Sequence, residues 1–481
     1  MPPASNKASA TAPANAVAPF TVAIIGSGII GTVLALGLST RSIPVKVYEQ
    51  SRSHREIGAG IAFTANARRC LALIDPRLED CVTAVATVNG DPAAPNNNMQ
   101  FVDGFTHDPV LHRGVGEEMV GRKVWRLWAG ERGFEGCHRA HFLEGVMGVL
   151  PEGVVEMGRR VEGVVCPEGE GKVRVVFSDG SFEEADIVIG CDGLKSRIRA
   201  HFYPPPNPIG QPHYTHKVAY RGLIPMPLAI STLGHSRATN QQMYGGPNAH
   251  VLHFPVARQT LLNVVAFVTD PTDWPLEQSM TQPAGGPGKE ELRAAFASWG
   301  PTVRAIIDLL LVSGEGLDKW GVFDMFDFPA PAYSQGRVCV AGDAAHASSP
   351  HHGAGAGIGV EDGLALCVLL ERARDELIHN ESEGQGQGQG QGRADAGGKK
   401  RGKAEILEKA LQVFSDVRLE RSQWLVRSSR EVCETYEWVN AACGRDMERG
   451  FEDVKARSHR IWDFDIEGMV GELGRGFESD S

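Results

Sequence analysis

Three glycines and one glutamate near the start of the chain have the spacing of a dinucleotide-binding motif. Gly26, Gly28 and Gly31 form a Gly-x-Gly-x-x-Gly run, and Glu49 follows about twenty residues later. The first glycine permits a tight turn, the second lets the backbone approach a pyrophosphate, and the third lets a helix pack on a strand. The start of that helix stabilises phosphate charge. A carboxylate at Glu49 would accept ribose hydroxyls and repel a 2′-phosphate, so the motif predicts the adenosine diphosphate of FAD or NAD rather than NADP.

The segments around these residues are the ones that such a motif requires. Residues 21–25 form a short apolar run that is typical of a buried parallel strand. Residues 32–39 have an apolar helical pattern, and residues 45–48 form a second strand that ends at Glu49. A glycine run alone is weak evidence, but a strand, glycines, a helix, a strand and an acid in this order are specific.

Two further aspartates follow strand-like segments. Residues 185–189 lead into Asp192 and Gly193. Residues 337–341 lead into Asp343. Open α/β sheets bind ligands at the carboxyl ends of their strands, although a single aspartate there is also an ordinary helix cap. Two such sites and the glycine motif in one chain favour ligand binding.

These motifs together resemble a known enzyme family. The stretches GSGIIG, CDGLKSRIR and GDAAHASSPHHGAGAGIGVEDG resemble the single-component FAD-dependent aromatic hydroxylases, which include salicylate and p-hydroxybenzoate hydroxylases. The similarity runs from about Val22 to the C-terminal helices and is greatest to fungal monooxygenases that dearomatise phenolic polyketides of azaphilone, tropolone and sorbicillinoid pathways. It implies an α/β fold in which a Rossmann-like FAD-binding domain is interleaved with an antiparallel-sheet substrate domain and C-terminal helices. It also implies hydroxylation of a phenol by O2 through a flavin C4a-hydroperoxide, with NAD(P)H as reductant and NADPH favoured.

The resemblance assigns roles to several residues. Asp343 would bind the ribityl chain of FAD, and Asp192 and Gly193 would lie near the pyrophosphate. Arg139 matches the family's flavin-contacting arginine, and Gly60, in the run IGAGI, matches the segment beside the isoalloxazine ring.

A glycine-rich loop over residues 350–359 precedes a helical pattern over residues 360–374. Glycines such as Gly355 and Gly357 would let bare backbone N–H groups approach a flat ring. A helix start at this place would stabilise negative charge on a reduced flavin. We therefore expect this loop to contact the flavin.

The stretch between the two aspartate motifs has alternating, aromatic-rich runs that are typical of antiparallel strands. Arg221, in the sequence YRGL, matches the family's phenolate-binding arginine; its alternative role is a structural ion pair. The pKa of a phenol, about 10, must drop by ~3 units for the phenol to ionise at neutral pH, and one nearby cation supplies about 1–3 units.

His250 and His253 are candidates to deprotonate the substrate, and His253 is our catalytic candidate, although strand histidines are often structural. Phe254 and Phe134 stand where some relatives place a tyrosine. Packing or capping roles are expected for His346, His351 and His352.

Two other functions fit the motifs. A salicylate-type decarboxylating hydroxylase would pair Arg221 with a carboxylate and release CO2. A non-catalytic sensor would bind FAD or NAD without substrate-stimulated NAD(P)H oxidation. The chain has no second Gly-x-Gly-x-x-Gly run after a strand and no CxxC or CxxxxC pair. NAD(P)H is therefore expected to dock transiently.

Composition excludes several classes of protein. The net charge of −11 argues against nucleic-acid binding, and 42% hydrophobic residues exclude wholesale disorder. Nine scattered cysteines without metal spacing predict free thiols in the cytoplasm and no metal site. The longest apolar run is interrupted by glycines, so no membrane span is predicted. The expected partners are a small phenolic molecule and O2; the oligomeric state is left open, with a homodimer as one possibility.

Glycine is the most over-represented residue type, at 57 of 481 residues, or about 12% against a typical ~7%. Part of this excess is the repeat GQGQGQGQG, which predicts a flexible loop. A helical region begins after it, at residue 404. The predicted divisions are a disordered tail (1–19), an FAD-binding domain that includes part of the substrate layer (20–200 and 335–380), a substrate sheet (201–334), a flexible Gln/Gly loop (381–403) and a C-terminal helical region (404–481).

Overall fold

The computed structural model describes residues 17–53, 60–105, 124–167, 169–275, 279–313, 317–386 and 401–479. Most of the predicted tail, most of the Gln/Gly loop and residues 57–59 lie outside the described residues. The tail was predicted to reach residue 19, but Ala18 is buried and its N–H donates to the carbonyl of Ser42 at 3.0 Å. The folded chain therefore begins earlier than its composition indicates.

The strands predicted around the three motifs form the centre of one sheet of six strands, in the order β10-β2-β1-β14-β22-β21. All neighbouring strands are parallel except β21 and β22. Because parallel strands end at the same edge, the segments that follow β1, β14 and β22 meet there. The bounds are β1 (Val22–Ile25), β2 (Val45–Glu49), β10 (Val155–Met157), β14 (Ile187–Gly190), β21 (Ser334–Gln335) and β22 (Val338–Val340).

Helices cover one face of this sheet, and a small antiparallel sheet covers the other. The helical layer contains α1 (Ile29–Thr40), which packs on α11 (Gly355–Gly386). The opposite layer is the sheet β11-β12-β13, whose Phe177 ring packs edge-on against Tyr48 of β2 with centroids 5.0 Å apart. Its strands are β11 (Val161–Val165), β12 (Val173–Phe177) and β13 (Phe182–Ala185).

Helix α11 begins five residues before the predicted start at residue 360 and continues into the predicted loop, to Gly386. Its first turns are rich in glycine because they pack closely on neighbouring helices. A Cβ on Gly359 would lie 2.6 Å from Cδ1 of Ile30, and one on Gly357 would lie 3.1 Å from Oγ1 of Thr64. Beyond the packed region the helix continues because each added residue gains a backbone hydrogen bond.

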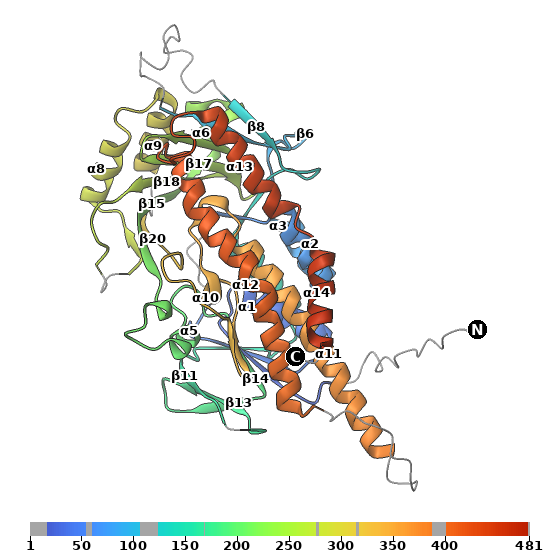
Figure 1. Ribbon diagram of the computed structural model, residues 1–481. Helices are drawn as coiled ribbons and strands as arrows, with labels where there is room; N and C mark the ends of the chain where they lie inside the picture. The colour runs from blue at the N-terminus through green and yellow to red at the C-terminus, as the bar shows by residue number, and fades with distance from the viewer. Residues whose placement is uncertain are drawn as a thin grey trace.

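A second, eight-stranded sheet has the order β19-β20-β15-β18-β17-β16-β7-β8 and is antiparallel except between β16 and β7. Most of it comes from the predicted substrate region, and β7 and β8 come from the first segment of the FAD-binding domain. The helices α6 (Met226–Leu233), α8 (Gly286–Ala295) and α9 (Pro301–Ser313) cover its outer face (Figure 1). The strands are β7 (Asn98–Asp103), β8 (Val124–Trp128), β15 (His213–Pro225), β16 (Gln242–Gly246), β17 (Ala249–Val256), β18 (Leu261–Thr269), β19 (Thr281–Pro283) and β20 (Asp318–Asp324).

Shorter elements connect the two large sheets. The strands β3 (Gly60–Ala62), β9 (Glu135–His138) and β4 (Thr87–Val88) form a three-stranded sheet, and β5 (Gly90–Asp91) pairs with β6 (Ala94–Pro95). The remaining short helices are α2 (Ala65–Ile74), α3 (Pro76–Val85), α4 (Arg139–Val149), α5 (Arg197–Phe202), α6 (Met226–Leu233), α7 (His235–Ala238), α8 (Gly286–Ala295), α9 (Pro301–Ser313), α10 (Asp343–His346) and the 3-10 turns η2 (Pro208–Gly210) and η3 (Pro350–His352).

The C-terminal region is helical, as predicted, and it spans both large sheets. Helix α12 (Lys403–Tyr436) packs beside α11 (Figure 1). It also contacts β21 of the first sheet and β16 of the second. Helices α13 (Met447–Trp462) and α14 (Ile466–Glu478) then return along it. Among the described residues, no helix combines the length and apolar character that crossing a bilayer requires.

Candidate active site

A cleft of about 800 Å³ lies at the carboxyl ends of β1, β14 and β22, and Arg221 and Trp320 of the eight-stranded sheet form part of its wall. Most of the predicted site residues meet here. Those that line the cleft are Gly26, Gly28, Glu49, Arg139, Asp192, Gly193, Arg221, Asp343 and Gly355. Those that do not line it are Gly31, Gly60, Gly357 and His253.

The first glycine loop has the geometry that a pyrophosphate needs. Gly26 has φ +100°, and a Cβ there would lie 2.6 Å from the carbonyl oxygen of Cys191. A Cβ on Gly31 would overlap the carbonyl oxygen of Gly26, so this glycine sets the packing of α1 on β1. Gly28 is the N-cap of α1 and, having no side chain, does not cap the N–H groups at the helix start. These free N–H groups face the cleft and form a site for an anion.

Glu49 ties the end of β2 to this loop. Its Oε2 accepts hydrogen bonds from the N–H of Ser27 at 2.9 Å and from the Ser27 hydroxyl at 3.1 Å, and its Oε1 accepts from the N–H of Ser51 at 2.8 Å. Burial acts to raise the pKa of Glu49, but the hydrogen bonds from Ser51 and Ser27 outweigh it and lower the pKa. The carboxylate is therefore ionised at neutral pH and fixes the loop beside the cleft.

Replacing Glu49 by glutamine should weaken FAD binding by about tenfold to a hundredfold, because hydrogen bonds to a charged group contribute about 1.5–3 kcal/mol. Titration of the FAD-free protein with FAD, followed by flavin fluorescence, measures this change. The matched control is Glu290→Gln, which removes a carboxylate from an exposed ion pair with Arg293 away from the cleft and should leave FAD affinity unchanged. Equal affinities of the two variants would contradict the role of Glu49.

The two motif aspartates use their carboxylates differently. Asp192 accepts from the hydroxyl of Ser196 and the N–H of Arg197, both at 2.6 Å, and so it holds the turn before α5. Gly193, with φ +75°, completes that turn. The Asp343 carboxylate is exposed in the cleft and accepts no hydrogen bond from the described residues. Asp343 is therefore the aspartate that is free to bind hydroxyl groups of a ligand.

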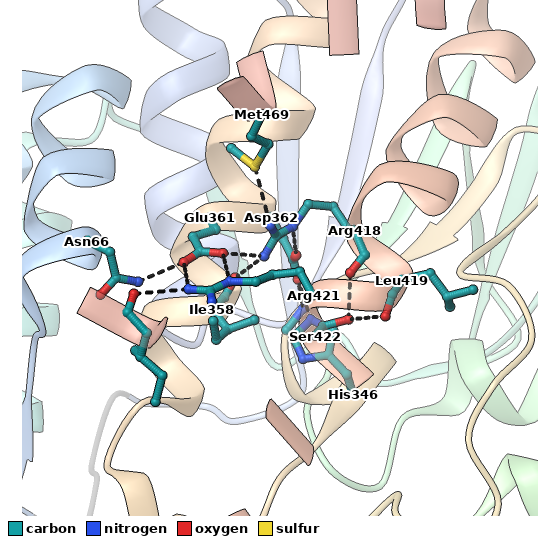
Figure 2. Close-up of polar contacts among 12 residues, drawn as sticks. Asn66, His346, Ile358, Glu361, Asp362, Arg418, Leu419, Arg421, Ser422 and Met469 are labelled. Carbon is teal, nitrogen blue, oxygen red and sulfur yellow. Dashed lines mark hydrogen bonds and ion pairs between the residues drawn. The ribbon is translucent and has the colours of Figure 1, made fainter. Parts of the chain in front are cut away.

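A buried network fixes the turn that carries Asp343 (Figure 2). The Asp362 carboxylate accepts from the N–H of Gly342 at 2.9 Å, from Nε2 of His346 at 2.6 Å and from Nε of Arg418 at 2.9 Å. Burial acts to raise the pKa of Asp362, but His346 and Arg418 lower it to about 2. The charged Asp362 thus anchors the backbone next to Asp343 from α11.

The neighbouring acid extends this network. Glu361 accepts from Nδ2 of Asn66 at 2.7 Å, from Nη2 of Arg418 at 2.8 Å and from Nη2 of Arg421 at 3.0 Å (Figure 2). The side chains of Glu361 and Arg418 are fully buried. This network was not predicted from the sequence, although two adjacent acids inside the apolar run GVEDGLAL are a signal of buried, paired carboxylates.

Arg221 is held loosely at the other side of the cleft. Its Nη2 is 4.0 Å from Oδ2 of Asp318, and its guanidinium carbon lies 4.7 Å from the centre of the Trp320 ring. The buried Nε has no hydrogen-bond partner among the described residues. Burial lowers the pKa of Arg221. The predicted alternative, a structural ion pair, is weak at this distance, and the unpaired Nε fits a residue that binds an anionic ligand.

Comparison with known proteins agrees with this geometry. A model of the FAD binding domain family matches residues 303–379. The FAD-dependent monooxygenase orf3 of Aspergillus niger is 45% identical over 460 residues, which are 95% of this chain and 97% of that protein. The chain belongs to the FAD-dependent monooxygenases.

Other relatives and a solved structure cover the chain equally well. The FAD-dependent monooxygenase pigN of Monascus ruber is 44% identical over 93% of this chain and 94% of that protein. Salicylate hydroxylase asL1 of Sarocladium schorii is 42% identical over 93% of this chain and 90% of that protein. A salicylate hydroxylase substrate complex is similar with a TM-score of 0.74 and 28% identity, covering 95% of this chain and 98% of that one.

The cleft of this monooxygenase fits FAD. An uncapped helix start faces it beside Gly28, and the free carboxylate of Asp343 suits the hydroxyls of a ribityl chain. Arg139 and Gly355 line the same space. The expected FAD cofactor is thus confirmed at the level of the family, and the individual contacts remain predictions.

The position of His253 corrects our catalytic assignment. In the register of the sheet, Arg221 lies opposite Val265, which lies opposite Leu252. Because side chains alternate along a strand, His253 points to the other face. There it is fully buried, its Nε2 is 3.4 Å from the hydroxyl of Tyr244, and burial lowers its pKa to about 3. His253 is a core residue of the monooxygenase.

Gly60 and Gly357 are glycines because of packing. A Cβ on Gly60 would lie 2.8 Å from Cζ of Phe254, whose ring packs edge-on against Phe134 with centroids 5.2 Å apart. The missing side chain of Gly357 faces α2 through Thr64. Close packing accounts for both glycines, and their predicted role beside the flavin stays a prediction.

Proposed function

We propose that this FAD-dependent monooxygenase hydroxylates a phenol with NAD(P)H and O2, and that the product is a dearomatised or ring-hydroxylated phenol without loss of carbon. The observation that carries the proposal is the position of Arg221. This cation stands in the same cleft as Asp343 and Gly355, with a buried donor that has no partner among the described residues.

The reaction needs an electron-rich ring, and Arg221 supplies the charge that favours one. Bound FAD, once reduced by NAD(P)H, would supply an electrophilic oxygen atom derived from O2. Arg221 would hold the phenolate oxygen and lower the pKa of the substrate by about 1–3 units. Apolar side chains on the same face of the sheet, such as Val265 and Leu252, would orient the ring and exclude water.

Salicylate-type decarboxylating hydroxylation is the second candidate. It is favoured by the name of the relative asL1 and by the similar salicylate hydroxylase complex. In this reaction Arg221 would pair with the substrate carboxylate, and one molecule of CO2 would leave as one oxygen atom enters.

Product mass distinguishes these reactions. The FAD-loaded protein is incubated with O2, NADPH or NADH, and either 2,4-dihydroxyacetophenone or salicylate. We expect a gain of one oxygen without loss of carbon from the acyl-resorcinol, with NADPH as the better reductant. Release of CO2 from salicylate alone supports the second candidate. NAD(P)H oxidation that neither compound stimulates would contradict both and favour a non-catalytic sensor.

We also propose that the protein works in the cytoplasm. All nine cysteines are free, and seven of them are buried. Unpaired thiols are typical of a reducing compartment.

A further inference from the structure

A path of hydrogen-bonded polar side chains leads from the glycine-rich loop to the surface. His351 of η3 has its Nδ1 3.3 Å from Nε2 of His250 of β17. The Nδ1 of His250 is 3.0 Å from Oε1 of Glu437, which follows α12. The other oxygen of Glu437 pairs with Lys217 of β15, whose Nζ also donates to the hydroxyl of Thr269 at 2.6 Å.

The side chains of this path become more exposed toward Lys217. The side chains of His250 and Glu437 are fully buried, whereas that of Lys217 is 17% exposed. Thr269, at the Lys217 end, is exposed. The path therefore connects the interior of the protein with solvent through groups that can exchange protons.

Glu437, which lies between His250 and Lys217, fixes the direction of the hydrogen bonds between the two histidines and itself. Burial acts to raise the pKa of Glu437, but His250 and Lys217 lower it, so the group is a carboxylate that can only accept. His250 must then donate through Nδ1 and accept through Nε2. His351 must donate through Nδ1 to that acceptor. Burial lowers the pKa of both histidines, which are therefore neutral. The Nε2 of His351 is left without a proton.

This unprotonated nitrogen belongs to a residue whose segment begins and ends at the cleft. His351 lies between Asp343 and Gly355, which both line the cleft. Its ring packs on Phe267 with centroids 4.8 Å apart. Phe267 stands opposite Ala219, two positions before Arg221 and on the same face of β15. His351, where the path of polar side chains begins, therefore packs on the same face of the sheet as the proposed phenolate site.

We propose that His351, His250 and Glu437 carry the phenolic proton of the substrate from the cleft to the surface. This inference rests on the proposed function, since Arg221 can hold a phenolate only after the proton has left. The phenolic O–H bond breaks and the proton binds Nε2 of His351. The Nδ1 proton of His351 passes to Nε2 of His250, and the Nδ1 proton of His250 passes to Glu437. Glu437 gives it to water beside Lys217, so one proton leaves and both histidines exchange tautomers.

Other charged groups around this path do not change the direction in which the proton moves. Lys217 and Arg430 lie near His351, and their positive charge disfavours a long-lived imidazolium there. Burial lowers the pKa of the neighbouring His352 to about 3, so this side chain is neutral. Cys433 donates to Oε1 of Glu437 at 3.4 Å and adds to the stabilisation of the carboxylate. A proton on His351 is therefore driven toward Glu437.

Proton release on phenol binding tests the proposal. The oxidised, FAD-loaded protein is mixed with 2,4-dihydroxyacetophenone in weak buffer with a pH indicator, in a stopped-flow instrument and without NAD(P)H. Glu437→Gln and His250→Asn should retain FAD and release the proton at least about tenfold more slowly below the pKa of the probe. Above that pKa the probe arrives ionised, and the variants should bind it at the rate of the unaltered protein.

The matched control is His253→Asn, which alters a buried histidine of the same strand on the opposite face. It should release the proton at the unaltered rate. Unaltered rates in Glu437→Gln and His250→Asn, or a defect that is equal at all pH values, would overturn the relay. Stoichiometric zinc in the purified protein would also overturn it, because ligand atoms of His250, His351 and Cys433 lie within 4.8 Å of one another.

The relay and the proposed function fail in different ways. Proton release by the unaltered protein without later hydroxylation under turnover conditions contradicts the proposed function and leaves the relay. Hydroxylation with normal release in both variants contradicts the relay alone. Absence of phenol binding by the unaltered protein contradicts both.

Discussion

An Arg221→Ala variant is expected to bind FAD normally and to lose product formation at neutral pH by about 10- to 1000-fold. One neighbouring cation lowers the pKa of an acid by about 1–3 units, so its removal reduces the phenolate fraction by that factor. The loss should shrink as the pH approaches the pKa of the free phenol, because solution then supplies the phenolate. Product quantified by mass spectrometry across this pH range, at equal flavin absorbance, measures the effect.

Two further variants show whether the effect belongs to this position. Arg293→Ala removes an arginine from an exposed ion pair with Glu290 on α8 and should leave activity unchanged. Arg221→Lys keeps the charge but loses the planar donor set, so activity should return only in part. Full turnover by Arg221→Ala would remove the main support for the proposed function.

An Arg418→Met variant is expected to lose about 3–5 kcal/mol of stability, since it leaves buried carboxylates without their cation. Among the described residues, Glu361 would retain Arg421, but Asp362 would retain only His346 as a side-chain partner. The turn before Asp343 depends on Asp362, so FAD should also dissociate more readily. Urea unfolding of the FAD-loaded protein, followed by tryptophan and flavin fluorescence, tests both effects.

The control for this prediction is Arg174→Met. Arg174 pairs with Glu184 across β12 and β13, and both side chains are nearly half exposed. Exposed pairs contribute about 0–1 kcal/mol, so the midpoint of unfolding should barely move. A similar small change in Arg418→Met would show that the buried network does not hold the turn.

The cofactor half of the site could be predicted from sequence because its signals are local. Gly26, Gly28, Glu49 and Asp343 each stand at the end of a strand or within three residues after it, and parallel strands bring such ends together. The position of Arg221 followed from the resemblance of its motif. Spacing within a few residues was enough to place the first glycine loop and the two motif aspartates at the cleft.

The orientation of His253 and the buried polar contacts could not be predicted, because they depend on pairing between distant segments. The face to which His253 points is decided by the register of β17 against β18, and a shift of one residue would reverse it. The contact of Glu361 with Arg418 joins residues 57 positions apart. Likewise, His250 meets Glu437 across 187 positions. No local pattern encodes such partners.

Helix α12 has a consequence for the exchange of parts between related monooxygenases. Near its middle, Arg418 reaches Asp362 beside the cofactor turn, and directly after its end Glu437 reaches His250 in the eight-stranded sheet. A chimera that receives a new eight-stranded sheet but keeps its old C-terminal helix would mismatch these partners. The sheet and residues 403–437 should therefore be transplanted as one piece.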